Sequence, residues 1–184
     1  MQYVPRLTAP SSSNLYYIKT TYNGYNKCIL INSSTGSVLP NCTGYAWGRF
    51  MECQDNVHDC NLSRGDAGNW YGHTSDGYDR GFLPKLGSVI CWDKVGGAGH
   101  VAIVEKIKAN GDITTSNSAY NGRRFFLEDL KKSNNYRRGS SYTFQGFIYN
   151  PTDFNTPAKK SSKVKFPWVL YSRKLRSKVR FDNN

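Results

Sequence analysis

The chain has 184 residues, of which 38% are hydrophobic and 14% aromatic. This length suits one ordinary domain with a short extension, and the aromatic content excludes a chain that is disordered throughout. The formal net charge is +12, from 25 Lys and Arg against 13 Asp and Glu.

The positive charge is concentrated towards the end of the chain. Residues 158–184 hold nine Lys and Arg and one acid, a net of +8, whereas residues 1–157 have a net of only +4. A basic segment of this kind attracts polyanions such as nucleic acid, anionic lipid or wall teichoic acid. The plain alternative is a solvated charged extension without a partner.

The cysteine count and the apolar runs define the expected environment. The five cysteines cannot all pair within the chain, so at least one thiol is expected, and a disulfide scaffold is not. We find no apolar run typical of a signal peptide and none long enough for a membrane span. The cysteines are Cys28, Cys42, Cys53, Cys60 and Cys91.

The first residues of the chain show no pattern of a helix or a strand. Residues 1–13 contain two prolines and three serines and predict a flexible polar arm. Two short apolar runs follow, at 15–18 and 28–31, and the Asn23-Gly24 pair between them indicates a hairpin turn.

A helix is predicted next. Asn41 is a good N-cap, and apolar residues recur at helical spacing from Cys42 to about Cys53. Residues 65–71 indicate a second short helix, and the Gly-, Asp- and Pro-rich stretch 72–86 predicts a long surface loop.

The second half of the chain predicts strands. The apolar pattern and the turn signals favour strands over residues 88–92, 100–107, 113–118 and 142–149, with turns at 95–99 and 110–112. Residues 123–132 read as a short helix or irregular structure. Helices followed by an antiparallel meander indicate an α+β fold, with N-terminal helices packed on an antiparallel β-sheet.

Three residues in this framework suggest a thiol hydrolase. Cys42 starts a helix, whose N-terminal N–H groups and dipole stabilise a thiolate, and its own N–H is placed to meet an oxyanion. His100 starts a strand and would form an ion pair with Cys42. Asn117 ends the neighbouring strand, where it can orient the imidazole.

Each of these residues also has a purely structural interpretation. A lone cysteine is usually a small buried side chain, a lone histidine beside an apolar strand is usually structural, and a lone asparagine usually lies in a turn. Their combination, with a helix cap and a shared hairpin, is what favours the catalytic interpretation.

Four sequence blocks resemble a known family. They are PNCTGYAWGR (40–49), GSVICW (87–92), GHVAIVE (99–105) and SNSAYNG (116–122). In this order they resemble the CHAP domain family, the cysteine- and histidine-dependent amidohydrolases and peptidases. They are particularly similar to the CHAP domains of bacteriophage endolysins that act on staphylococci and related Gram-positive bacteria.

The resemblance covers about residues 14–150 and leaves 151–184 as a linker and basic C-terminal tail. It implies a papain-like fold and hydrolysis of an amide bond in peptidoglycan. By motif, Cys42 corresponds to the nucleophile and His100 to the base. Asn117 stands where many members carry Glu and others Asn.

The sequence says less about the residues that bind substrate and about cofactors. Asn41 and Tyr120 are the candidates for the oxyanion and substrate groove, with Tyr71 and Tyr78 as further groove walls. No cofactor and no metal is expected. The calcium site of some family members requires acidic residues before the nucleophile, and residues 32–41 have none.

Weaker metal patterns have plain alternatives. Cys53, His58, Cys60 and His73 match no zinc spacing, and the loop 55–59 is more typical of a solvated loop than of a cation site. The tryptophans Trp47, Trp70 and Trp92 are expected in the core.

These observations predict a peptidoglycan hydrolase, either an endopeptidase or an N-acetylmuramoyl-L-alanine amidase, that forms a thioester. The expected partners are Gram-positive peptidoglycan and, through the basic tail, teichoic acids, without nucleic acid and as a monomer. Without a signal peptide, such an enzyme would be made in a bacterial cytoplasm and reach the wall through a holin or on a virion. The alternatives are a non-catalytic wall- or polyanion-binding module, and one module of a longer lysin or phage tail device.

Overall fold

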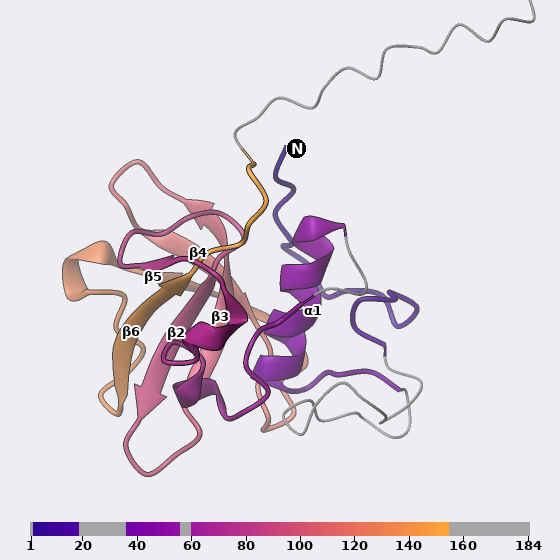
Figure 1. Ribbon diagram of the computed structural model, residues 1–184, viewed down its shortest axis with the longest axis horizontal. Helices are drawn as coiled ribbons and strands as arrows, with labels where there is room; N and C mark the ends of the chain where they lie inside the picture. Colours follow the sequence, from indigo (N-terminus) through magenta and orange to yellow (C-terminus); the bar gives the residue numbers. More distant parts are fainter. Residues whose placement is uncertain (1, 19–35, 56–59, 155–184) are drawn as a thin grey trace, which may run out of the picture.

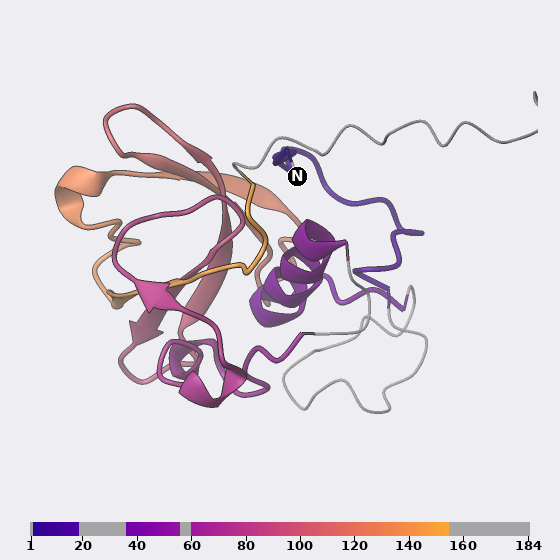
Figure 2. The same ribbon diagram turned by 45° about the horizontal axis from the view of Figure 1, so that its top comes forward.

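The computed structural model describes residues 2–18, 36–55 and 60–154. In this part of the chain one α-helix lies against one side of a six-stranded antiparallel sheet (Figures 1 and 2). This arrangement confirms the predicted α+β class.

The helix α1 spans Cys42–Gln54, as its cap and periodicity predict. Asn41 is extended, and its side-chain oxygen accepts a hydrogen bond from the Gly44 N–H at 3.0 Å. The cap satisfies one of the first-turn donors that have no acceptor within the helix. The helix ends at Asp55, which adopts a left-handed conformation.

The sheet has the strand order β1-β6-β2-β3-β4-β5. The strands β2 to β5 form a meander, and β6 returns to pair with β2 between it and the short β1. The strands are β1 (Arg80–Gly81), β2 (Val89–Lys94), β3 (His100–Ile107), β4 (Ile113–Asn117), β5 (Phe126–Leu130) and β6 (Tyr142–Ile148). The described residues also form three single 3-10 turns, η1 (Ala67–Asn69), η2 (Thr74–Asp76) and η3 (Lys132–Asn134).

Both faces of the sheet are buried. Successive side chains of a strand point to opposite faces, so β2 contributes Val89 and Cys91 to the core under α1, and Ile90 and Trp92 to a second core behind the sheet. The tryptophans Trp47, Trp70 and Trp92 are all buried, as expected.

Several predicted elements differ in the structure. The stretch 72–86, predicted as a loop, contains η2 and the short strand β1. The short helix expected over residues 65–71 is only the 3-10 turn η1. Residues 123–132 contain the strand β5, whose register places Phe126 opposite Asn117 and Leu130 opposite Ile113. Pairing with β4 outweighs the low strand preference of the acidic residues in β5.

The N-terminal segment differs from the flexible arm that the sequence predicts. The Tyr3 hydroxyl donates to Glu105 Oε2 at 2.6 Å, and Arg6 Nε donates to Glu52 Oε2 at 2.9 Å. These contacts attach the segment to α1 and β3, and the first residues run beside the helix in Figures 1 and 2.

Some expectations lie outside the described residues: the hairpin at Asn23-Gly24, the run 28–31, and most of the linker and basic tail at 151–184. Within the described ranges, no helix has the length and apolar character needed to cross a membrane. The four cysteines of these ranges form no disulfide with one another.

Candidate active site

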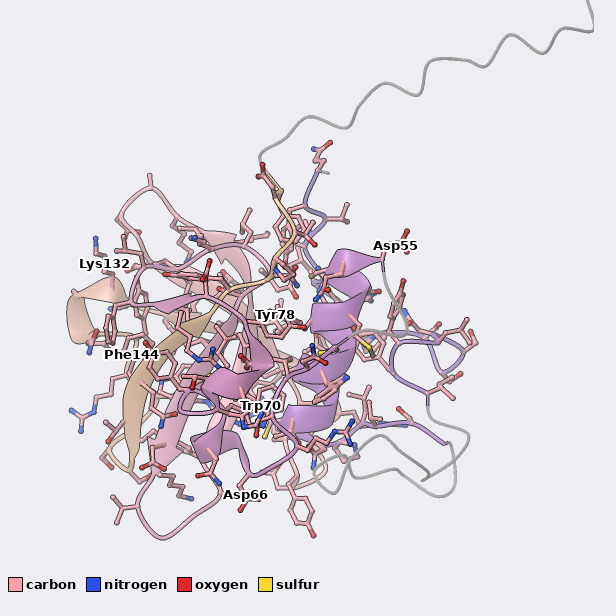
Figure 3. The ribbon with its side chains drawn as sticks, viewed as in Figure 1. Asp55, Asp66, Trp70, Tyr78, Lys132 and Phe144 are labelled. Carbon is pink, nitrogen blue, oxygen red and sulfur yellow. The ribbon has the colours of Figure 1, made fainter. Side chains whose placement is uncertain are left out.

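A cleft of about 600 Å³ opens at the N-terminal end of α1. Figure 3 labels Asp55 at the C-terminal end of this helix and Asp66, a residue of the cleft, towards its opposite end. The lining includes Cys42 and His100 together with residues from the loops around β2, β5 and β6. The cleft therefore joins the two residues expected to carry the chemistry.

Cys42 is the first residue of α1. Its backbone N–H belongs to the turn whose donors have no intrahelical acceptor, so it remains available to an anion in the cleft. The residue is partly exposed and lines the cleft.

Two opposing effects act on the Cys42 thiol. Burial raises its pKa, while hydrogen bonds from the backbone of Val101 and Thr43 and the positive charge of Arg138 lower it. Burial is the larger effect, and the pKa lies above its ordinary value. The resting form at neutral pH is therefore the thiol.

His100 lies at the start of β3, and its ring packs against Trp92 and Tyr142, with centroid distances of 5.8 and 6.5 Å. Its Nε2 is 3.0 Å from Asn117 Oδ1. Burial and, to a lesser extent, the positive charge of Arg138 lower the pKa of His100 to about 3, and the hydrogen bond with Asn117 opposes them. The imidazole is neutral at physiological pH.

The hydrogen bonds around Asn117 determine which imidazole nitrogen is protonated. Asn117 Nδ2 donates to the Thr115 carbonyl at 3.3 Å and to Thr115 Oγ1 at 3.0 Å, which turns Oδ1 towards His100. An amide oxygen only accepts, so Nε2 of His100 carries the proton. Nδ1 is left with a lone pair and is the basic atom of the ring.

The charge state differs from the sequence expectation, although the placement agrees. His100 and Asn117 meet across neighbouring strands as the hairpin predicts. Burial acts against the thiolate–imidazolium ion pair that the sequence predicts, because it raises the pKa of Cys42 and lowers that of His100 and so disfavours both charged forms.

Gly99 allows the turn before His100 to pack tightly. Its φ is +75°, and an added Cβ would lie 2.4 Å from the backbone nitrogen of Gly68. Only glycine fits such a conformation and such an approach. The turn before His100 therefore packs closely against η1.

The groove residues divide into two groups. Asn41 and Tyr120 both line the cleft, and Tyr120 is 76% exposed. Asn41 Oδ1 accepts from the Gly44 N–H to cap the helix, and the only side-chain donor that Asn41 could offer an oxyanion is Nδ2. Tyr71 and Tyr78 do not line the cleft, which is a correction: Tyr71 contacts Phe82, and Tyr78 contacts Phe50 beneath α1.

Several residues of the site are not among those that the sequence predicts. Ser118 Oγ accepts from the Asn41 N–H at 3.0 Å and so ties the helix cap to the end of β4. Thr115 orients Asn117, and Arg138 places a positive charge near both Cys42 and His100. Ser118 follows Asn117 in its sequence block, but nothing in the sequence indicates Arg138.

No group of three or more His, Cys, Asp or Glu residues within the described ranges is arranged to hold a metal ion. Of the weak zinc pattern, His58 lies outside these ranges.

The depressed pKa of His100 predicts a pH-dependent stability. The pKa of His100 is about 3 in the folded protein and ordinarily 6.5. Below pH 6.5, His100 therefore binds a proton in the unfolded chain but stays neutral in the folded one. Stability should fall with falling pH, by up to about 1.4 kcal/mol per unit, and should be unaffected by His100 above pH 6.5. Urea unfolding from pH 7.5 to 4.5 measures the slope. His100→Gln, neutral throughout, should show a shallower slope, and equal slopes would contradict a neutral buried imidazole.

Replacing Thr115 with valine should reduce turnover through Asn117. Thr115→Val removes the hydroxyl that accepts from Asn117 Nδ2, and we expect kcat to fall about tenfold with KM little changed. The matched control is Thr114→Val, whose hydroxyl donates to Asp129 on the exposed side. Equal kinetics for the two variants would show that Thr115 does not position Asn117.

A cysteine at a helix N-terminus, in one cleft with a strand-borne histidine that has an asparagine partner, is the set of groups that a cysteine-dependent hydrolase requires. Residues 32–119 match the family model of the CHAP domain, and this range contains Cys42, His100 and Asn117. The match supports the resemblance seen in the sequence blocks, and it falls within the 14–150 segment assigned to the domain.

Three known proteins are similar to parts of this chain. A protein of Streptococcus mutans serotype c named "Putative hydrolase" is 34% identical over 67 residues, which are 32% of this chain and 31% of that protein. The crystal structure of N-acetylmuramoyl-L-alanine amidase from Staphylococcus aureus is 22% identical, with a TM-score of 0.46 over 60% of this chain and 30% of that one. The crystal structure of Ly7917 with the hydrolyzing product of MDP is 17% identical, with a TM-score of 0.41 over 61% and 54% of the two chains. The chain thus spans less than a third of the curated relative that it matches.

Proposed function

We propose that this protein is a cysteine-dependent peptidoglycan hydrolase in which Cys42 is the nucleophile and His100 the general base. The observation that carries the proposal is one cleft lined by Cys42 and His100, in which Asn117 Oδ1 lies 3.0 Å from Nε2 of the imidazole. The match of residues 32–119 to the CHAP domain supports it.

Acylation follows from the neutral pair. As Cys42 Sγ attacks the carbonyl carbon, Nδ1 of His100 takes the thiol proton, and the S–C bond forms. The Cys42 N–H donates to the oxyanion at the positive end of α1. The C–N bond then breaks, the imidazolium gives its proton to the leaving amine, and a thioester remains.

In deacylation, water is the nucleophile and the Cys42 sulfur is the leaving group. His100 takes a proton from water as the water oxygen attacks the thioester carbon. The C–S bond breaks, the imidazolium returns its proton to the sulfur, and a carboxylic acid leaves. Asn117 acts throughout as a positioning residue, because it contacts the imidazole and not the substrate. No cofactor enters these steps.

The substrate that we propose is the stem peptide or cross-bridge of a Gram-positive wall. The bond is either the N-acetylmuramoyl-L-alanine amide or a peptide bond such as D-Ala-Gly. We further propose that the enzyme is of the phage endolysin type, that it acts as a monomer at the wall after release by a holin or on a virion, and that its basic tail contacts teichoic acids.

Mass spectrometry of digested walls tests this function. Purified Gram-positive sacculi are incubated with the protein, and the new ends are identified. New glycine amino termini identify an endopeptidase, and free lactyl groups identify an amidase. A folded protein that binds walls and releases neither end would overturn the enzyme and favour a binding module.

A further inference from the structure

One wall of the cleft alternates positive charges with aromatic rings. Arg123 Cζ lies 3.9 Å from the Phe126 centroid, and Arg138 Cζ lies 5.7 Å from Phe126 and 5.4 Å from the Tyr142 centroid. Lys94 Nζ lies 5.4 Å from the same Tyr142 ring. We call these five residues, Arg123, Phe126, Arg138, Tyr142 and Lys94, the cation ladder.

The cation ladder draws on distant parts of the chain. Lys94 ends β2, Phe126 begins β5 and Tyr142 begins β6, while Arg123 and Arg138 lie in the loops before β5 and β6. All five residues line the cleft that holds Cys42 and His100. The two rings hold three like charges in one row, as cation–π contacts can.

The charges of the ladder are not balanced within the described residues. Arg138 donates from Nε to Glu128 Oε2 at 2.7 Å. No carboxylate in the described ranges forms an ion pair with Arg123 or Lys94, and Asp66 is the only acidic residue among the cleft's lining. The two ends of the ladder therefore present uncompensated positive charge beside the reacting residues.

We propose that the cation ladder binds a carboxylate of the substrate, so that the enzyme prefers stem peptides with a free carboxylate over the same peptides with a carboxamide. This inference rests on the proposed function, because it concerns the molecule cleaved at Cys42. Arg and Lys pair with carboxylates through charge-assisted hydrogen bonds, which a neutral amide does not replace.

The position of the ladder favours a group on the cleaved molecule over a separate polyanion. The ladder reaches Tyr142, whose ring contacts His100, so its ligand shares the cleft with the scissile bond. A stem peptide offers such carboxylates at D-glutamate and at its terminal D-alanine. A teichoic acid seated there would block the cleft and inhibit hydrolysis.

The test uses two pairs of soluble muropeptides that keep both candidate scissile bonds. One pair differs in carboxylate against carboxamide at the D-glutamyl residue, and the other at the terminal D-alanine. We expect kcat/KM to favour the carboxylate by about tenfold in at least one pair, mainly through KM. High salt should reduce the preference, because Arg123 is exposed.

Charge-removing variants identify the residues responsible. Arg123→Gln and Lys94→Gln, and above all the double variant, should lose the preference while hydrolysis of the carboxamide peptide is retained. The matched control is Lys85→Gln, because Lys85 also lies over a tyrosine ring, Tyr149 at 3.9 Å, outside this cleft. The control should keep the preference.

The outcomes separate the two proposals. Equal hydrolysis of both members of both pairs would overturn the inference and leave the hydrolase standing. Equal losses on carboxylate and carboxamide peptides in the variants would also overturn it, as would strong inhibition by teichoic acid without any peptide preference. Hydrolysis of no peptide and no wall by the folded protein would overturn the proposed function and the inference together.

Discussion

Cys42→Ala is expected to reduce wall hydrolysis by at least about a thousandfold, because no other group in the proposed mechanism attacks the carbonyl. His100→Ala should lose about as much, since a thiol with a raised pKa needs a base to become a nucleophile. The double variant should be no worse than either single one, because the two side chains act in one step. Release of soluble fragments from purified walls measures all three.

Two controls keep this prediction specific. Wall binding by Cys42→Ala should equal that of the unmodified protein, since the sulfur contributes little to the surface of the cleft. Cys91→Ala removes a thiol buried in the core under α1, and should retain turnover if it folds. Full lytic activity of Cys42→Ala would exclude the mechanism.

Glu105→Ala is expected to cost about 3–5 kcal/mol of unfolding free energy, the usual effect of removing one member of a buried ion pair. Glu105 is 1% exposed. It accepts from Arg49 Nε at 2.9 Å, from Ser116 Oγ at 2.7 Å and from the Tyr3 hydroxyl at 2.6 Å. Without Glu105, the positive charge of the buried Arg49 guanidinium is balanced by Glu52 alone among its ion-pair partners in the described residues. Thermal unfolding should shift down by about 10 °C.

The matched control for Glu105 is an exposed ion pair of the same sheet. Asp129 and Lys108 are 2.8 Å apart, with side chains 61% and 47% exposed. Asp129→Ala should cost less than about 1 kcal/mol. Similar shifts for Glu105→Ala and Asp129→Ala would show that burial does not strengthen the role of Glu105.

The sequence predicts those elements whose stabilising contacts join residues close to one another along the chain. Asn41 caps α1 because its own side chain reaches the Gly44 N–H, and that contact spans three residues. The strand at His100–Ile107 follows from its run of β-branched residues. The pairing of His100 with Asn117 follows from one hairpin.

Features that depend on distant partners are not predictable in this way. The strand β5 exists through its register with β4, and the N-terminal segment is held by Glu105, about a hundred residues away. The charge state of Cys42 and His100 depends on how deeply the fold encloses them, which residue types alone do not reveal. The cation ladder cannot be predicted from the sequence for the same reason, because three strands and two loops bring its residues together.

The attachment of the N-terminal segment has a consequence for protein engineering. Glu105 receives the Tyr3 hydroxyl and the Arg6 N–H on one side and the Ser116 hydroxyl on the other, and Ser116 directly precedes Asn117. Fusion partners or affinity tags joined ahead of Tyr3 therefore need a spacer that lets this segment dock. Chimaeras that begin at Leu15 would lose the hydrogen bonds of Tyr3 and Arg6 to Glu105, and with them the support that Glu105 gives to the strand bearing Asn117.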